Sequence, residues 1–450
     1  MTTYYSLSPR QIQDWHINYT IKKGQSPNVL TFDIRLPGNT DLACFHKAYA
    51  DLIKKHAILR TSFPLIDGEI KLQVHDYDPD RFSLSCEGCL EGKETVINVY
   101  KYALPKFRNI RHGPLIRAIL LKDQDNGYLF IFLIHHIICD YRSLSILKGE
   151  METLYYRARM GEQIQIPCDH SHWMDYLERN KTKVDLTQAK TLQYWRNELL
   201  DMKWRINYDT LYNKVPNVLL PVAHSKKRRG WSDLYQSDLL KKPKGESYIV
   251  FAGDDLLEKL HKFKTASKFS VFTILLTGLT ILAAKLTENN CILTQITYSD
   301  RNRAETNNLI GNLLGTLLLY IDIDVDNTFR ELAKKVYTSF FISIDNMLYN
   351  TESLESLKLT PNSFLFFNFI SKEVSGGGKV SITPPAAGKK VDAKCPLYCM
   401  ATEFDNTIKF HWEYHLSFFN RQIIAFLTDS CFSLLQTLMD APDKPIKFAL

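Results

Sequence analysis

The stretch Ile131-Phe-Leu-Ile-His-His-Ile-Ile-Cys-Asp-Tyr141 contains two adjacent histidines and, four residues after the second, an aspartate. The apolar run from Tyr128 to Ile134 is too short and too aromatic for a membrane span and predicts a buried strand. Apolar side chains at helical spacings follow the aspartate, at Leu144, Leu147, Met151, Leu154 and Tyr155. The sequence therefore predicts two imidazoles at a strand-to-helix turn.

His135 and His136 allow more than one interpretation. A histidine at the end of a buried strand suits a general base, because burial and a fixed partner tune its proton affinity. Neighbouring strand residues point to opposite faces, so at most one of the two faces a given pocket. Asp140 could cap the following helix, or could join the histidines in a metal site. No third His or Cys lies at ligand spacing nearby, so we expect no metal.

The composition is that of an ordinary soluble globular protein. The chain has 450 residues, of which 45% are hydrophobic and 23% charged. This length predicts two or three domains, or two lobes that share a core. The most apolar segment, 271–284, is too short to span a bilayer and predicts a buried helix. We therefore expect no association with a membrane.

The net charge of +7 is mildly basic for this length. The densest basic clusters are Lys226–Arg229 and the lysines at 241, 242 and 244, which lie in a stretch of poor periodicity. They favour a solvated loop, although a mild positive face could attract an acidic protein partner. No aromatic or Gly-rich binding motif accompanies the charge, so we expect no nucleic acid.

Nine cysteines are spread along the chain. Cys86 and Cys89 form a CxxC pair, and Cys395 and Cys399 form a CxxxC pair. A shared zinc site is a weak alternative, because neither pair has the Gly-rich surroundings of a zinc knuckle. The odd count and the absence of a secretory signal at the start of the sequence predict reduced thiols in a cytoplasmic protein.

Strand and helix patterns alternate through both halves, which predicts an α/β or mixed α+β fold. Helices are predicted from Ser8-Pro9 and over 40–56, with Thr40 as cap, 186–200, 254–266, 269–286, 327–348 and 420–439. Strands are predicted over 28–36, 69–75, 115–121, 247–252, 291–297, 363–370 and 406–414. The weakly patterned region 180–250 is the expected lobe boundary, which gives lobes 1–178 and 179–450.

Five stretches resemble motifs of the condensation-domain family of nonribosomal peptide synthesis, within the chloramphenicol-acetyltransferase-like superfamily. Ser8-Pro-Arg-Gln-Ile-Gln-Asp-Trp15 resembles S-x-A-Q-x-R-L-W, and Lys55-His-Ala-Ile-Leu-Arg-Thr-Ser-Phe63 resembles R-H-E-x-L-R-T-x-F. His135-His-Ile-Ile-Cys-Asp-Tyr141 resembles H-H-x-x-x-D-G except at its last position. His172-Trp-Met-Asp-Tyr176 resembles Y-x-D-F-A-x-W weakly, and Asp300-Arg-Asn-Arg-Ala-Glu-Thr-Asn-Asn-Leu-Ile-Gly311 resembles R-N-R-x-E-x-x-x-L-I-G well. The motifs follow the family's order and spacing over nearly the whole chain.

The resemblance implies two acetyltransferase-like lobes in a V-shaped pseudo-dimer, with the active site in a tunnel between them. It implies transfer of an acyl group from a thioester on the phosphopantetheine arm of a carrier protein to an amine, or less often an alcohol. The product is an amide or an ester. The carrier's phosphopantetheine arm is the only cofactor implied, and we expect a monomer.

The resemblance also implies roles for individual residues. His136 is the implied catalytic residue, which accepts the proton of the amine or orients its lone pair, whereas His135 is mainly structural. Asp140 is expected to form a buried salt bridge with Arg301, facing away from the chemistry and shaping the turn. Arg60 is expected to be a further structural arginine.

Three departures distinguish this chain from the family pattern. Tyr141 stands where the signature has glycine, and its ring could narrow the acceptor side or lend its hydroxyl to the substrate. A tyrosine there would be strained if the backbone needed a positive φ. The motif F-V-N-T is replaced by Leu313-Leu-Gly-Thr316, so that Gly315 replaces an asparagine. The motif H-Q-D-x-P-F-E is not recognisable near Asp345.

The two lobes account for all 450 residues, so we expect a free-standing enzyme without attached modules. The leading hypothesis is an amide- or ester-forming acyltransferase of natural-product biosynthesis, with an acyl or peptidyl carrier protein and a small amine or alcohol as its partners. A second hypothesis is a catalytically silent condensation-like protein that binds a carrier protein or recruits a partner. A third keeps catalysis but takes the donor from acyl-CoA.

Overall fold

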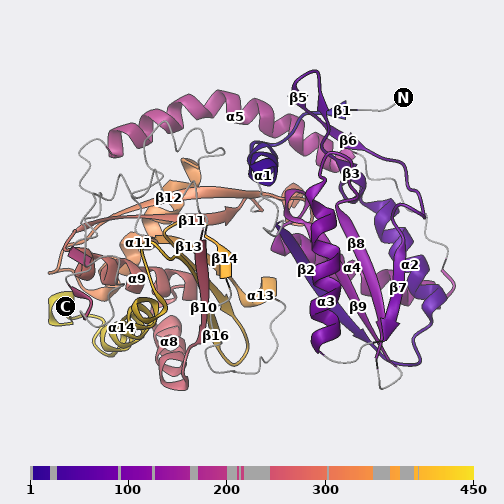
Figure 1. Ribbon diagram of the computed structural model, residues 1–450. Coiled ribbons are helices and arrows are strands. Elements are labelled where there is room, and N and C mark those ends of the chain that lie inside the picture. Colours follow the sequence, from indigo (N-terminus) through magenta and orange to yellow (C-terminus); the bar gives the residue numbers. More distant parts are fainter. Residues whose placement is uncertain are drawn as a thin grey trace. The chain divides into compact units, whose positions relative to one another are not determined.

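The structure, a computed structural model, forms two compact units (Figure 1). It describes residues 4–20, 28–89, 93–123, 127–162, 171–199, 210–211, 214–216, 244–301, 304–347, 365–375, 390–393 and 395–449. The first lobe comprises Met1–Thr187 and Ser299–Leu314, and the second comprises Gln188–Tyr298 and Gly315–Leu450. This division differs from the expected lobes, 1–178 and 179–450, in residues 179–187 and 299–314. The basic cluster at 226–229 lies outside the described residues.

The first lobe is built on a four-stranded sheet in the order β2-β9-β8-β7. Its strands are β2 (Val29–Leu36), β9 (Tyr128–His135), β8 (Ile116–Lys122) and β7 (Leu84–Cys89). The strand β9 pairs antiparallel with both β2 and β8, and β7 runs parallel to β8. The strand predicted from the apolar run before the histidines is therefore confirmed, and it is central in the sheet.

Both faces of β9 are apolar because helical segments cover the sheet on both sides. Phe130 and Phe132 belong to the cluster that contains residues of α2 (Leu42–Lys55) and α4 (Tyr141–Arg159). Ile131 and Leu133 belong to a separate cluster that contains residues of α3 (Lys93–Ala103) and η2 (Leu104–Arg108). Small strands complete the lobe: β1 (Tyr4–Tyr5), β3 (Thr61–Ser62), β4 (Leu65–Ile66), β5 (Glu69–Ile70) and β6 (Leu72–Val74).

Polar side chains define where the first helices begin. Helix α1 (Pro9–Thr20) starts after Ser8, as predicted, and the Ser8 hydroxyl accepts a hydrogen bond of 3.1 Å from the backbone N–H of Gln11. The Gln11 side chain accepts the Ser8 N–H in return. Thr40 was the wrong cap for α2, because Asp41 accepts the Cys44 N–H at 3.0 Å. The helix begins at Leu42, so the residue at the cap position is Asp41, while the hydroxyl of Thr40 donates to the carbonyl of Pro37.

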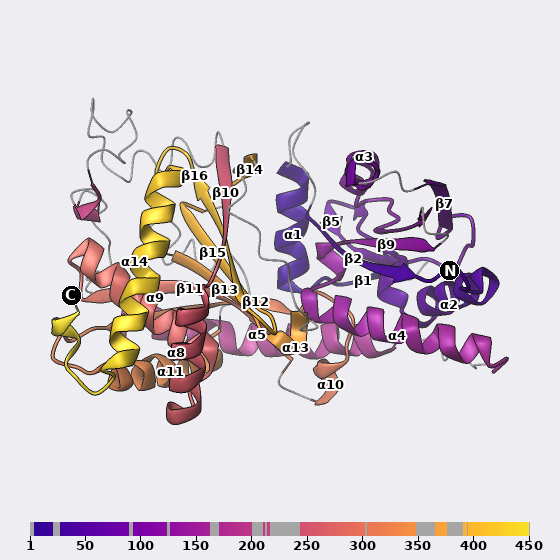
Figure 2. The ribbon, with the colours of Figure 1, turned by 90° about the horizontal axis from the view of Figure 1, so that it is seen from below.

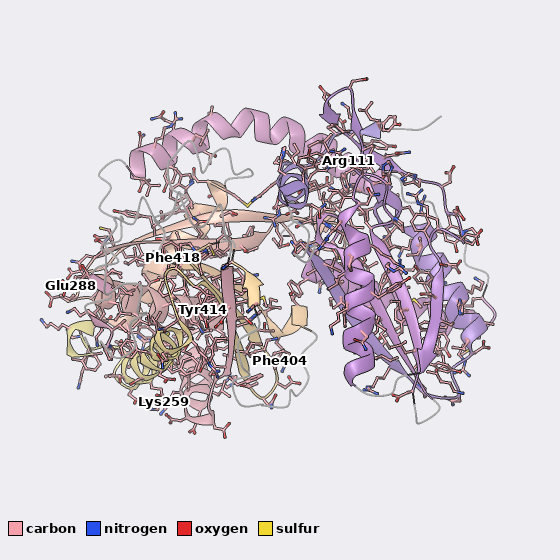
Figure 3. All side chains as sticks on the ribbon, in the orientation of Figure 1. Arg111, Lys259, Glu288, Phe404, Tyr414 and Phe418 are labelled. Atoms are coloured by element: carbon pink, nitrogen blue, oxygen red, sulfur yellow. The ribbon has the colours of Figure 1, made fainter. Side chains whose placement is uncertain are left out.

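The second lobe contains a seven-stranded sheet in the order β12-β11-β13-β15-β16-β10-β14. The strands are β10 (Lys244–Phe251), β11 (Cys291–Ser299), β12 (Leu314–Asp322), β13 (Leu365–Ile370), β14 (Lys390–Asp392), β15 (Leu397–Glu403) and β16 (Ile408–His415). Figure 2 shows three helices on one side of this sheet: α8 (Asp254–Ser267), α9 (Val271–Thr287) and α14 (Arg421–Asp440). Tyr414 and Phe418, labelled in Figure 3, are fully buried in the core of this lobe.

The apolar helix predicted over 269–286 is α9, and nearly all of its residues are buried, as expected. Helix α14 is the one described helix that is long and apolar enough by itself to cross a membrane; α8 and α9 pass the same test only when taken together as one bent span. Core helices of globular domains also pass that test, and Leu427 and Leu438 of α14 are buried in the lobe core. Helix α11 (Phe329–Asp345) completes this layer.

Helix α5 (Ser171–Glu198) is much longer than the helix predicted over 186–200. Its first turns carry only a narrow apolar stripe, including Trp173 and Leu177, among polar residues, which is why periodicity did not indicate a helix there. The boundary between the two lobes falls within this helix. The remaining short elements include the helices α10 (Ala304–Asn307) and α13 (Lys372–Ser375) and the 3₁₀ turns η1 (Ala57–Arg60) and η7 (Ile446–Phe448).

Candidate active site

The two histidines lie where β9 ends and a short turn leads into α4. His135 is the last residue of β9, and His136 begins the turn η3 (His136–Ile138). The backbone N–H of His136 donates to the carbonyl of Asn28 at 2.8 Å. Asp140 then caps α4 by accepting the Ser143 N–H. The motif is therefore held within the first lobe at both ends, by a backbone hydrogen bond of His136 and by the side-chain cap of Asp140.

His135 has the arrangement of a structural histidine. Its side chain is buried, and Nδ1 accepts the backbone N–H of Ile137 at 3.1 Å. Its Nε2 lies 3.2 Å from Oδ1 of Asn18. Because Nδ1 accepts a hydrogen bond, the single proton of the neutral ring must be on Nε2. Nε2 therefore donates to the amide oxygen of Asn18. Both ring nitrogens are engaged inside the lobe, in keeping with the role expected from the resemblance.

His136 contacts Asn312, the first of three polar residues that are linked by hydrogen bonds and an ion pair. These contacts were not predicted from the sequence. Its Nδ1 lies 3.2 Å from Nδ2 of Asn312, and that Nδ2 also lies 2.7 Å from Oδ2 of Asp14. Asp14 forms an ion pair with Arg10 at 3.2 Å. Asp14 and Asn312 are both buried. A signal was present for each, because Asp14 stands beside the buried Trp15 and Asn312 interrupts an apolar run, and buried polar residues need partners.

Asp140 and Arg301 form the buried ion pair expected from the sequence. Nη2 of Arg301 lies 2.9 Å from Oδ1 of Asp140, and the two side chains are 7% and 1% exposed. The other carboxylate oxygen lies 3.2 Å from Nε of the same guanidinium. Oδ1 also accepts the N–H of Ser143 at 2.8 Å. The two interpretations of Asp140, helix cap and salt bridge, therefore both hold.

This ion pair is the centre of a network that joins α4 to residues 299–314. The Ser143 hydroxyl donates to the carbonyl of Gly311 at 2.9 Å and accepts the Gly311 N–H at 3.1 Å. Nη1 of Arg301 donates to the carbonyls of Thr306 and Leu309 at 3.0 and 2.7 Å. These bonds satisfy the buried polar groups of a segment with little regular structure.

Gly311 is a glycine because an aromatic ring packs directly on it. A Cβ atom at this position would lie 1.9 Å from the ring of Trp173, far inside contact distance. Trp173 comes from the weakest of the five motifs and is 3% exposed. The weak motif and the strong one therefore meet in the first lobe.

The departures at Tyr141 and Gly315 have structural explanations. Tyr141 is the first residue of α4 and is 38% exposed. It is not among the described non-glycine residues with positive φ, so the strain considered from the sequence does not arise. At Gly315 a Cβ atom would lie 2.7 Å from the sulfur of Met347. In this chain Met347 therefore fills the space beside Gly315 where a larger residue would project.

Arg60 is buried, as expected, and stabilises the end of α2. Its Nε and Nη2 donate to the carbonyls of Ile53 and Lys54 at 3.1 and 3.3 Å. Its Nη1 donates to the carbonyl of His75. Because the last carbonyls of a helix have no partner within the helix, Arg60 acts as a C-terminal cap.

The donor atoms of the motif do not fit a metal site. His135 uses both ring nitrogens on protein partners, and the carboxylate of Asp140 is occupied by Arg301 and the helix N-terminus. Burial raises the pKa of the Cys399 thiol well above its usual value, which disfavours the thiolate that a zinc ion would bind. Among the residues described by the structure, no group of three or more His, Cys, Asp or Glu is placed to hold a metal.

Known proteins share both the sequence pattern and the fold. The family model for the condensation domain matches residues 1–449. Bacitracin synthase 1 of Bacillus licheniformis is 24% identical over 451 residues, covering 98% of this chain and 8% of the synthase. Gramicidin S synthase 2 of Aneurinibacillus migulanus is 24% identical over 98% of this chain and 9% of the synthase. The chain thus spans less than a tenth of the length of these relatives.

Solved structures support the same fold. The condensation domain of the Monacolin K polyketide synthase MokA has a TM-score of 0.73 at 14% identity, covering 99% of both chains. The X-domain in its complex with OxyB, from teicoplanin biosynthesis, has a TM-score of 0.72 at 16% identity, covering 98% of this chain and 95% of that one. With a family match over 1–449, and with the His-His turn held by the ion pair of Asp140 and Arg301, this chain belongs to the condensation-domain family.

Proposed function

We propose that this chain is an acyltransferase that moves an acyl group from a thioester on a carrier protein's phosphopantetheine arm to an amine or hydroxyl acceptor. The observation that carries this proposal is the His-His turn, in which Asp140, Ser143 and Arg301 fix the backbone around His136. The condensation-domain family is generally acyltransferase-like. A thioester carbonyl is already reactive, so the enzyme mainly has to place the nucleophile and stabilise the charge that develops.

The proposed partners are an acyl or peptidyl carrier protein and a small amine or alcohol. Relatives of this chain are synthases named for bacitracin and gramicidin S, which supports a role in natural-product biosynthesis. A cytoplasmic location, a monomeric state and action as a free-standing enzyme stay predictions. An alternative within this proposal is that the acyl group comes from acyl-CoA, and offering both donors separates it from transfer from a carrier protein.

A second candidate function is a catalytically silent protein that binds a carrier or recruits a partner. Some condensation-like domains, X-domains among them, are catalytically inactive. Tyr141 in place of the signature glycine and Gly315 in place of an asparagine favour this candidate. So does the similarity in fold to an X-domain whose solved structure contains OxyB.

An intact-mass assay separates these candidates. Acyl-loaded carrier proteins and acyl-CoAs are offered with a panel of amines, amino acids and alcohols, to the wild type, to His136→Ala and to His16→Ala. His16 is an exposed histidine on α1 and serves as the matched control. We expect a new amide or ester with the wild type and His16→Ala, and a rate about 10²–10⁴-fold lower with His136→Ala.

Equal turnover by His136→Ala would refute the catalytic role of this histidine. No turnover by the wild type with any donor, together with measurable binding of a carrier protein, would support the second candidate. Turnover with acyl-CoA and not with the carrier would identify the soluble thioester as donor. Circular dichroism of each variant checks that loss of product does not reflect loss of fold.

A further inference from the structure

The orientation of the Asn312 side chain is fixed by its neighbours. Its Oδ1 lies 3.2 Å from the backbone N–H of Leu314, which can only donate a hydrogen bond. Its Nδ2 lies 2.7 Å from Oδ2 of Asp14, whose carboxylate is paired with Arg10 and can only accept. Exchanging the two amide atoms would place Oδ1 of Asn312 against the carboxylate of Asp14, and its NH₂ group against the N–H of Leu314. The amide nitrogen therefore faces both Asp14 and His136.

This orientation determines which nitrogen of His136 carries the proton. One hydrogen of the Asn312 amide is donated to Asp14. The same Nδ2 lies 3.2 Å from Nδ1 of His136, so its second hydrogen is the one available to that ring. Nδ1 must therefore accept, and a neutral imidazole with an accepting Nδ1 carries its proton on Nε2. A proton on Nδ1 would point one N–H at another.

We propose that Asp14 and Asn312 are positioning residues that hold His136 in the tautomer with the proton on Nε2. His136 then offers a hydrogen-bond donor to the reacting oxygen, whereas the resemblance implied that it accepts the proton of the amine or orients its lone pair. The tautomer follows from the contacts within the first lobe, whereas the donor role rests on the proposed function.

The reaction balances without a proton acceptor on His136. A neutral amine attacks the thioester carbonyl carbon, and the electron pair of the C=O π bond moves to oxygen, which receives the Nε2–H hydrogen bond. When the C=O bond reforms, the C–S bond breaks and the thiolate leaves. The proton on the new ammonium nitrogen passes to that thiolate, which gives an amide and a free thiol. Stabilising the anionic oxygen is the step for which a fixed donor is suited.

Nuclear magnetic resonance of histidine side chains tests the tautomer directly. Protein labelled with ¹⁵N in histidine is recorded at neutral pH through long-range proton–nitrogen couplings, and His136→Gln identifies the signals of this ring. We expect a protonated Nε2 and a bare Nδ1 in the wild type. The double variant Asp14→Asn/Asn312→Asp exchanges the two side chains at equal net charge and nearly equal volume. It places an acceptor beside Nδ1, so we expect the proton to move there.

Asn312→Leu provides a second route if the exchanged variant does not fold. It removes the donor beside Nδ1, so the fraction of rings protonated on Nδ1 should rise. Asn18→Leu is the matched control, because it removes a buried amide that contacts His135 and should leave the His136 signals unchanged. A wild-type His136 with its proton on Nδ1 would overturn the proposal, as would a folded exchange variant that keeps the wild-type pattern.

The activity of the same variants tests the donor role separately. If the proposed acyl transfer holds, Asn312→Leu should lower the rate with a loaded carrier by about 10²–10³-fold, the usual effect of losing one donor to an anionic oxygen. An unchanged rate in a variant whose tautomer has shifted would refute the donor role. The tautomer is measured by nuclear magnetic resonance without any substrate. A protein that lacks the proposed activity would therefore not change the conclusion on the tautomer, and the two failures can be told apart.

Discussion

Replacing Asp140 by alanine should destabilise the first lobe severely. The carboxylate accepts the Ser143 N–H at the start of α4 and pairs with Arg301 at 2.9 Å, and both charged side chains are buried. The variant loses a helix cap and leaves a buried guanidinium without its counterion. Arg301 keeps its hydrogen bonds to the carbonyls of Thr306 and Leu309, which partly compensate its charge.

The expected loss follows from these two effects. An N-cap contributes typically about 1 kcal/mol to the free energy of unfolding. Breaking a buried ion pair from one side costs about 3–5 kcal/mol. The remaining carbonyl bonds of Arg301 favour the lower end, so we expect a loss of about 4 kcal/mol from these effects together. Since domains are stable by only about 5–15 kcal/mol, Asp140→Ala should unfold at much lower urea concentrations or be poorly soluble.

Urea unfolding followed by circular dichroism measures this loss. Glu305→Ala is the matched control, because it removes the exposed partner of Arg179 and should cost less than about 1 kcal/mol. The double variant Asp140→Ala/Arg301→Met removes both charges, so its loss should be smaller than the sum of the single losses. An Asp140→Ala protein within about 1 kcal/mol of the wild type would refute the buried-pair argument.

Three further substitutions test the packing and the titration of buried groups. Gly311→Ala should cost about 1–3 kcal/mol or more in urea unfolding, because its Cβ would lie 1.9 Å from the rigid ring of Trp173. Gly315→Ala meets only the flexible end of Met347 and should cost less; equal losses would contradict this contrast. Burial and a nearby arginine lower the pKa of His75 from 6.5 to about 4. Between these values the unfolded chain binds a proton that the folded chain does not, so stability falls as the pH drops through this window. The fall should be smaller in His75→Gln, and identical pH profiles for the two proteins would contradict the assignment.

Much of the fold could be predicted from periodicity where the pattern was strong. The apolar run of β9 and the apolar helix α9 are present, and α8, α11 and α14 lie close to the ranges predicted for them. The strands β7, β12 and β15 and the helix α3 were not predicted. Short apolar runs such as that of β12 are compatible with a strand or a buried helix, and only the neighbouring strands decide between them.

The candidate site could be predicted only as far as its motifs reach. Asp140, Arg301 and Arg60 occupy the buried positions that the resemblance implied. The apolar surroundings of Asn312 and Asp14 could have indicated that each is buried. Their pairing could not be predicted, because it joins positions 298 residues apart and no local pattern encodes it. The role expected for His136, to accept the proton of the amine or orient its lone pair, came from the resemblance and stays a prediction. The proposed tautomer could not be predicted, because it depends on which atom of a distant amide faces the ring.

The segment Ser299–Leu314 follows β11 and leads into β12, two neighbouring strands of the second lobe, yet its contacts place it in the first. The first lobe is therefore not a contiguous stretch of the gene. A chimera that exchanges residues 1–187 with a relative would combine Asp140, Ser143 and His136 of one parent with Arg301 and Asn312 of the other. Chimeras of such domains should keep their activity when Ser299–Leu314 comes from the same parent as the N-terminal half. When it does not, loss of activity should be most frequent where the two parents differ at Asn312.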